Sequence, residues 1–147
     1  MSENFDFLNT TEHISLKQPG LLFGGMERLL AQAEAIVFLK DADLKYVAAS
    51  PAMVAMAEKS SASELLGRTD LEVLRDQDLA RRYMEDDRRV LERGHDLVDY
   101  IEPIQGENGE IHYASTSKYP IWDDKGNIRH SRHLQRCDPA DPGSSAV

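Results

Sequence analysis

Apolar positions recur along the first third of the chain, first with helical and then with strand-like spacing. Residues 21–34 carry leucine, methionine and alanine at helical intervals, which predicts a short amphipathic helix. Residues 36–41 and 44–50 are rich in β-branched and aromatic residues around a short polar turn, which predicts a hairpin. Ser50 before Pro51 then predicts a helix start, because serine caps the first turn and proline suits its geometry.

The pattern continues with helical segments and returns to strands. A second short helix is predicted from Ser63 to Gly67, and Asp70 is predicted to cap the turn that follows. The longest helix covers residues 76–93 and ends at Gly94. Three strands follow, over residues 97–104, 111–122 and from 128 onward. Strands at both ends of a helical middle favour an α+β domain, with an antiparallel sheet and helices on one face.

Composition divides the chain into four segments. The polar residues 1–20 are interpreted as a flexible lead-in, and residues 21–34 form the N-terminal helix. Residues 35–136 are predicted to form the folded domain. The turn-forming residues 137–147 are predicted to be disordered.

Charge, hydropathy and cysteine content bear on which partners and which cellular location can be expected. The chain has 147 residues, with 26 acids against 17 bases and a net charge of −9. An acidic surface repels phosphate backbones, so direct binding to nucleic acid is not expected. No apolar run approaches the ~20 residues of a membrane span and no secretory signal is visible, so we expect a cytoplasmic protein without a membrane partner. The single cysteine, Cys137, excludes an internal disulfide.

Four motifs stand in a characteristic order: "FLKDADLKYVAASPAM", "ELLGRTDLEVL", "DLARRYMEDDRRVLERG" and "GEIHYASTSKYPIWDDKGNI". Over about residues 35–128 the chain resembles a bacterial PAS sensory domain. The resemblance implies the PAS fold, a five-stranded antiparallel sheet whose helices enclose a small cavity. It also implies a sensory role of the kind found in histidine kinases, diguanylate cyclases and transcription regulators.

The resemblance leaves two functions open. In the first, the domain binds a small molecule or cofactor and modulates an effector domain (a kinase, a cyclase or a DNA-binding domain) that is missing from this chain. In the alternative, the domain is a ligand-free dimerisation module. Either function would use a homodimer formed through the N-terminal helix and the outer face of the sheet.

Departures from related domains bear on the cofactor. The light-sensing flavin subgroup carries a reactive cysteine in a region that here reads "GRTDLEVLRDQD", without cysteine. Haem-binding relatives place a histidine on or just before the long helix, and residues 71–93 contain none. Photoactive flavin and haem are therefore disfavoured, and the cofactor stays unknown.

Asp87 is the first candidate for a ligand contact. It interrupts the apolar stripe of the long helix, four residues after Tyr83 and three before Val90. Unpaired burial of a carboxylate costs several kcal/mol, about 2–7 even for a neutral polar group, so Asp87 needs a partner. Either it binds a polar or cationic ligand, or it pairs structurally with Lys118 or a backbone donor.

The strand 111–122 offers a second group of candidates. Its odd positions place the small hydroxyls Ser115 and Ser117 between aromatic and aliphatic ends. We expect this face to point inward and to leave room for a ligand, although an outward orientation would make it a dimer face. The inward orientation would place Lys118 on the opposite face and weaken its pairing with Asp87.

Methionines and aromatic residues complete the candidate pocket. Met53 and Met56 suit an adaptable pocket, although methionine is also an ordinary core residue. The predicted ligand-binding residues are Phe38, Met53, Met56, Tyr83, Asp87, Tyr100, Ser115 and Ser117.

Patterns typical of catalysis and metal binding are absent from the sequence. We find no Ser-His-Asp order, no glycine-rich phosphate loop and no Cys-His pair with a plausible orienting residue, so the chain is not expected to be an enzyme. His130 and His133 could form a metal pair only on a helix, so no metal site is expected.

The final strand is unusually cationic. Residues 129–133 read Arg-His-Ser-Arg-His, where related domains carry an apolar, glycine-spaced strand. One back-translation of residues 129–139, read one base later, encodes Gly-Ile-Leu-Gly-Ile-Ser-Ser-Asp-Val-Thr, an ending of the family's kind. Two interpretations stay open: a native polar edge strand, which would limit aggregation, or an out-of-frame reading of residues 129–147.

Overall fold

The computed structural model describes residues 19–106, 108–122 and 128–139, and the side chains of residues 24–106 and 108–122. The predicted lead-in up to residue 18 and the predicted tail beyond residue 139 lie outside the described residues.

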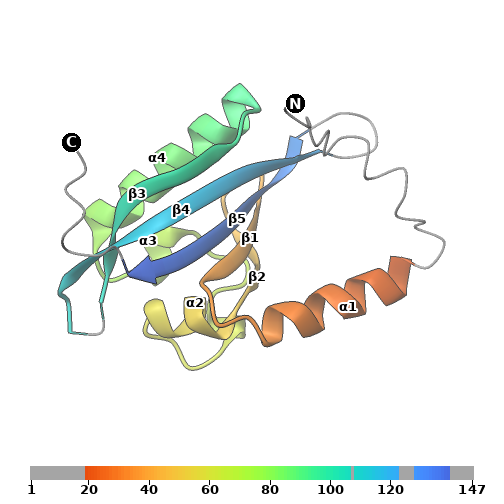
Figure 1. Ribbon diagram of the computed structural model, residues 1–147, viewed down its shortest axis with the longest axis horizontal. Helices are drawn as coiled ribbons and strands as arrows, with labels where there is room; N and C mark the ends of the chain where they lie inside the picture. Colours follow the sequence, from red (N-terminus) through yellow and green to blue (C-terminus); the bar gives the residue numbers. More distant parts are fainter. Residues whose placement is uncertain (1–18, 107, 123–127, 140–147) are drawn as a thin grey trace, which may run out of the picture.

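An antiparallel sheet forms one layer of the domain (Figure 1). Its five strands have the spatial order β2-β1-β5-β4-β3. Their bounds are β1 Val37–Asp41, β2 Tyr46–Ala49, β3 Leu97–Gln105, β4 Ile111–Trp122 and β5 Ile128–Pro139. The last strand along the chain is therefore the middle strand of the sheet, with β1 on one side and β4 on the other.

Helices separate the first two strands from the last three. The helical elements are α1 Pro19–Ala31, α2 Pro51–Met56, the 3-10 turn η2 Ala62–Glu64, α3 Asp70–Val73 and α4 Gln77–Arg93. Helix α4 packs against β3, β4 and β5, while α1 extends away from the sheet (Figure 1). The α+β class predicted from the sequence is confirmed. Within the described part of the chain, no helix is long and apolar enough to cross a membrane.

Local sequence signals explain the helix ends. The Ser50 side chain accepts a hydrogen bond from the Met53 amide at 3.3 Å, with Pro51 in the first turn, as predicted. Gly94 ends α4 in the left-handed conformation, with φ of 64°, which glycine adopts without steric cost. The second predicted helix is shorter than expected and lies earlier, as a single 3-10 turn over Ala62–Glu64 that begins with a capping box between Ser61 and Glu64.

The core lies between the sheet and the helices. Its buried apolar side chains come from β1, β2, α2, α3 and α4 and from connecting residues such as Leu65, and include Phe38, Tyr46, Met53, Leu65, Val73 and Ala80. The same layer contains charged side chains that are equally buried, among them Lys40 and Lys118, each 1% exposed. Burial of this kind is rare unless the charges are paired, so these residues locate the candidate site.

The position of β5 decides one alternative about the cationic strand. A strand between two partners is not an edge, so the interpretation of residues 129–133 as a polar edge strand is wrong. A native ending with a polar middle strand and an out-of-frame reading both stay hypotheses.

Replacing residues 129–133 with an apolar strand tests that hypothesis. The changes are Arg129→Gly, His130→Ile, Ser131→Leu, Arg132→Gly and His133→Ile. A middle strand is expected to contribute apolar area to the core, so the melting temperature should rise, by roughly 3–6 °C for each kcal/mol gained. Thermal unfolding followed by circular dichroism checks this, and an unchanged or lower melting temperature would contradict it.

Candidate functional site

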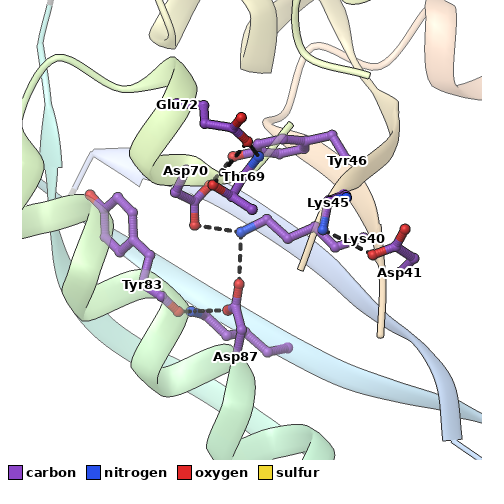
Figure 2. A network of polar contacts seen from close by, with 10 residues as sticks. Lys40, Asp41, Lys45, Tyr46, Thr69, Asp70, Glu72, Tyr83 and Asp87 are labelled. Carbon is purple, nitrogen blue, oxygen red and sulfur yellow. Dashed lines mark hydrogen bonds and ion pairs between the residues drawn. The ribbon is translucent and has the colours of Figure 1, made fainter. Parts of the chain in front are cut away.

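Five ionisable side chains from five different elements meet inside the domain. They are Lys40 of β1, Asp70 of α3, Asp87 of α4, Glu102 of β3 and Lys118 of β4, and none is more than 2% exposed. We call this set the buried charge cluster. Figure 2 shows its centre, where Lys40 points between Asp70 and Asp87.

Asp87 is the carboxylate that connects the two lysines. Its Oδ2 accepts from Lys40 Nζ at 2.7 Å, and its Oδ1 accepts from Lys118 Nζ at 2.8 Å. Lys40 also donates to Asp70 Oδ2 at 2.5 Å, and the Tyr46 hydroxyl donates to Asp70 Oδ1. Acids and bases therefore alternate from Asp70 to Lys118, so that each of these charges faces an opposite one.

The strands and helices present these groups by simple alternation. On β1, Phe38 and Lys40 are buried while their neighbours are half-buried, so both point toward the helices. On β4, the buried positions are Ala114, Thr116 and Lys118. Asp87 lies on the buried stripe of α4, as the sequence predicts.

Asp70 plays a different part from the one predicted. The cap of α3 is Thr69, which forms a capping box with Glu72, and the Glu72 carboxylate accepts from the Thr69 amide at 2.7 Å. The prediction that Asp70 caps this turn is therefore wrong. Its carboxylate instead turns inward to Lys40 and Tyr46 (Figure 2).

The surroundings of Lys40 and Tyr46 shift the pKa of both side chains upward. Burial lowers the pKa of Lys40, but attraction to Asp70 and Asp87 outweighs burial and leaves the pKa above its usual value. Burial and the neighbouring Asp70 carboxylate raise the pKa of Tyr46 well above its usual value. At neutral pH, Lys40 is therefore a cation and Tyr46 a neutral hydrogen-bond donor.

Glu102 is the acid with the clearest upward shift. Burial raises its pKa, and the charge of Lys118 and a hydrogen bond with Thr116 offset burial only in part. The nearby carboxylates of Asp87 and Asp86 raise it further. Protonation of Glu102 is consequently easier in the folded domain than in the unfolded chain.

The space left between these side chains is small. The cavity has a volume of about 10 Å³, which is room for about one water molecule. Its walls combine the buried charge cluster with apolar and aromatic groups, namely Phe38, Tyr46, Met53, Met56 and Tyr83. The arrangement can bind a compact polar group, provided that contacts within the cluster open to admit it.

Five of the eight predicted ligand-binding residues line this cavity. They are Phe38, Met53, Met56, Tyr83 and Asp87. Tyr100 is not among the lining residues, and its hydroxyl accepts a hydrogen bond from Arg82 at 3.4 Å.

The predicted inward orientation of Ser115 and Ser117 is wrong. Both are half-buried on the face of β4 opposite to Lys118, and the Ser117 hydroxyl accepts from the Asp99 amide at 3.1 Å. The even face points inward because Lys118 reaches Asp87, and that ion pair is incompatible with serines facing the helix. Pairing with Lys118, one of the two possibilities for Asp87, is present.

Sequence reasoning missed five residues of the cavity wall, which are Lys40, Tyr46, Asp70, Glu102 and Lys118. A signal was available for Lys40, because it alternates with Phe38 on a strand whose other inward position is apolar. A charged residue at an inward position of a strand indicates a buried partner.

The variant Asp87→Asn tests the central role of this carboxylate. It leaves two buried lysines with one acceptor charge fewer, and breaking a buried ion pair typically costs about 3–5 kcal/mol of unfolding free energy. Urea unfolding measures the loss. Glu85→Gln on the same helix is the control, because its pair with Arg89 is exposed and its loss should cost ~1 kcal/mol or less. Equal losses in the two variants would contradict the assigned role.

The variant Glu102→Gln tests the pH dependence. Because the folded pKa of Glu102 is raised, its protonation stabilises the domain fully below the unfolded pKa of about 4.5, and this contribution is lost as pH rises through the folded value. Glu102→Gln should remove that loss and raise stability at neutral pH relative to wild type. Urea unfolding at several pH values checks this, with the exposed Glu92→Gln as control; identical pH profiles for wild type and Glu102→Gln would refute it.

Comparisons with known proteins agree on the fold. A family model described as "PAS fold" matches residues 30–134. No curated protein matches the chain. Among solved structures, VqmA bound to DPO superposes with a TM-score of 0.68 at 24% identity, covering 79% of this chain and 57% of that chain. A structure of the Vibrio cholerae VqmA dimer has the same TM-score and identity and is covered over 52% of its length.

Two further structures extend the comparison. The PAS domain of Bordetella pertussis BvgS has a TM-score of 0.67 at 17% identity, covering 80% of this chain and 86% of that domain. An RNA-binding light-oxygen-voltage receptor has a TM-score of 0.64 at 19% identity, covering 84% of this chain and 34% of that receptor. The chain thus spans about half the length of the VqmA chains that it resembles. Since the PAS-fold model covers more than half of the sequence, this chain belongs to the PAS-fold family.

Proposed function

We propose that this chain is a cytoplasmic sensory PAS domain that binds a small polar molecule at the buried charge cluster and modulates an effector domain. The observation that carries the proposal is the convergence of five charged side chains from five elements in the core. Buried ion pairs contribute little net stability compared with well-packed apolar residues, so stability alone does not account for them. Clusters of buried ionisable groups with shifted pKa values are typical of functional sites.

The topology supports a route from the cavity to the rest of the domain. Lys40 lies on β1 and Lys118 on β4, and these two strands flank β5. A ligand that competes for Asp87 would loosen one or both lysines from α4. The strands would then shift relative to the helix, and β5, which pairs with both of them, would shift as well.

Similar proteins support the ligand and the effector in this proposal. One VqmA structure is of the protein bound to DPO and another is of a VqmA–ligand–DNA complex. A third, of the VqmA dimer without target DNA, concerns DNA binding by LuxR-type receptors. Because the chain matches only about half of those receptors, we propose that a separate effector domain receives the signal. The ligand and cofactor identities stay open in this proposal.

A second candidate function is a ligand-free dimerisation module. The small cavity favours it, since ~10 Å³ admits no more than about one water molecule. Exposed apolar side chains also favour it, on the outer face of the sheet and on α1: Ile101, Ile111, Tyr113, Met26 and Leu29. We propose these surfaces as the homodimer interface in either function.

Mass spectrometry of the purified chain separates the two functions. For a sensory domain, native spectra should show a small-molecule adduct that denaturing spectra release. The adduct should be lost in Asp87→Asn and kept in Glu85→Gln, because only the first variant alters the cavity wall. A dimer without any adduct, and without binding in a screen of small polar compounds, would reject ligand sensing and support the dimerisation module.

A further inference from the structure

Two carboxylates and two aromatic rings surround the ammonium group of Lys40. Its Nζ is 2.5 Å from Asp70 Oδ2 and 2.7 Å from Asp87 Oδ2. The same atom lies 5.1 Å from the ring centroid of Phe38 and 4.9 Å from that of Tyr46. We call Phe38, Tyr46, Asp70 and Asp87 the ammonium cage.

The chemistry of this cage is specific for a small cation. Two carboxylates accept charge-assisted hydrogen bonds from the N–H groups, and aromatic faces within ~6 Å attract the positive charge. The two rings meet edge to face, with centroids 5.4 Å apart, so their relative orientation is fixed by direct contact. The hydrogen bond from the Tyr46 hydroxyl to Asp70 holds that carboxylate in place.

Lys118 does not occupy an equivalent site. Its Nζ donates to Asp87 Oδ1 at 2.8 Å and lies 3.5 Å from the backbone oxygen of Tyr83. The ring of Tyr83 is 5.8 Å away. The convergence of two carboxylates and two rings on one nitrogen is therefore a property of the Lys40 position.

We propose that the ammonium cage is a binding site for primary ammonium compounds and that the chain fills it with its own Lys40 side chain, a ligand tethered to β1. This inference rests on the proposed function, because it assigns a ligand class, primary ammonium compounds, to the cavity that we propose as the sensory site. A free amine enters only when the Lys40 side chain leaves the cage.

In the wild-type protein, a free amine must compete with the tethered Lys40 side chain, so a high concentration of amine is needed for binding. A covalently attached ligand acts at an effective concentration of millimolar or higher, so a free simple amine must exceed that concentration to displace it. Removing the lysine side chain removes the competitor. It takes one cation from between Asp70 and Asp87, while Lys118 still pairs with Asp87, so the vacated site becomes more negative by one charge.

Chemical rescue of Lys40→Ala tests the site directly. The atoms removed from lysine, beyond Cβ, are those of n-propylammonium. Lys40→Ala should melt well below wild type, because two buried carboxylates lose a shared cation. Addition of n-propylammonium chloride at tens of millimolar should raise its melting temperature by roughly 5 °C, relative to sodium chloride at equal ionic strength. Wild type should shift by less than about 1 °C, because its cage is already occupied.

Three controls isolate the ammonium. 1-Propanol fills the same volume without charge and should give no comparable rescue. Lys45→Ala removes an exposed lysine near the start of β2 and should behave as wild type. The double variant Lys40→Ala/Asp70→Asn keeps the cavity but loses one carboxylate, so n-propylammonium should no longer stabilise it more than 1-propanol does.

The outcomes decide the proposal in each case. The proposal is supported if n-propylammonium stabilises Lys40→Ala and 1-propanol does not. It is overturned if the amine and the alcohol have equal effects, or if neither has an effect. If Lys40→Ala does not fold by itself, the folded yield after refolding with amine or alcohol is the readout, and failure of the amine to restore it also overturns the proposal. This assay needs no natural ligand. If n-propylammonium fails to rescue Lys40→Ala but native spectra show an adduct, the ammonium cage is rejected and the proposed sensory function is kept. If n-propylammonium rescues the variant but no adduct is seen, the ammonium cage is kept and the proposed sensory function is rejected.

Discussion

The architecture depends on one buried carboxylate that contacts two strands at once. Asp87 accepts from Lys40 on β1 and from Lys118 on β4, and these strands are not neighbours, because β5 runs between them. Helix α4 is thus connected across the middle strand of the sheet through a single side chain. Both contacts form only if Asp87 lies on the inward face of α4 while Lys40 on β1 and Lys118 on β4 also point inward. A shift of either strand by one residue would turn its lysine to the opposite face.

This constraint also explains why the core combines charge with apolar packing. Each lysine carries its charge on an apolar stem, and the Nζ of Lys40 lies over the rings of Phe38 and Tyr46. Asp70 and Asp87 each accept from a lysine within hydrogen-bond distance, and the acid at the end of the cluster, Glu102, has the raised pKa expected where compensation of burial is incomplete. Partial compensation makes the charge of the interior depend on pH through Glu102, which the charge of an apolar core would not.

Much of the fold was predictable because its signals are local. The Ser50–Pro51 start, the Gly94 end and the inward position of Asp87 each follow from a few neighbouring residues. The face of β4 was not predictable in this way, because serine, threonine and alanine give both faces similar character and the decision belongs to Lys118 and a partner on another element. Lys40 was missed for the same reason, since its two acids lie 30 and 47 residues away along the chain.

The middle position of β5 has a consequence for folding during synthesis. The β1–β2 and β3–β4 hairpins can each form from nearby residues, but they join into one sheet only when β5 enters between β1 and β4. Until then, a nascent chain on the ribosome would present two unpaired strand edges, and Asp87 would lack the strand that holds its two lysines in register. Completion of the domain therefore requires contacts of long sequence separation, which form slowly and leave such edges open to association with other chains.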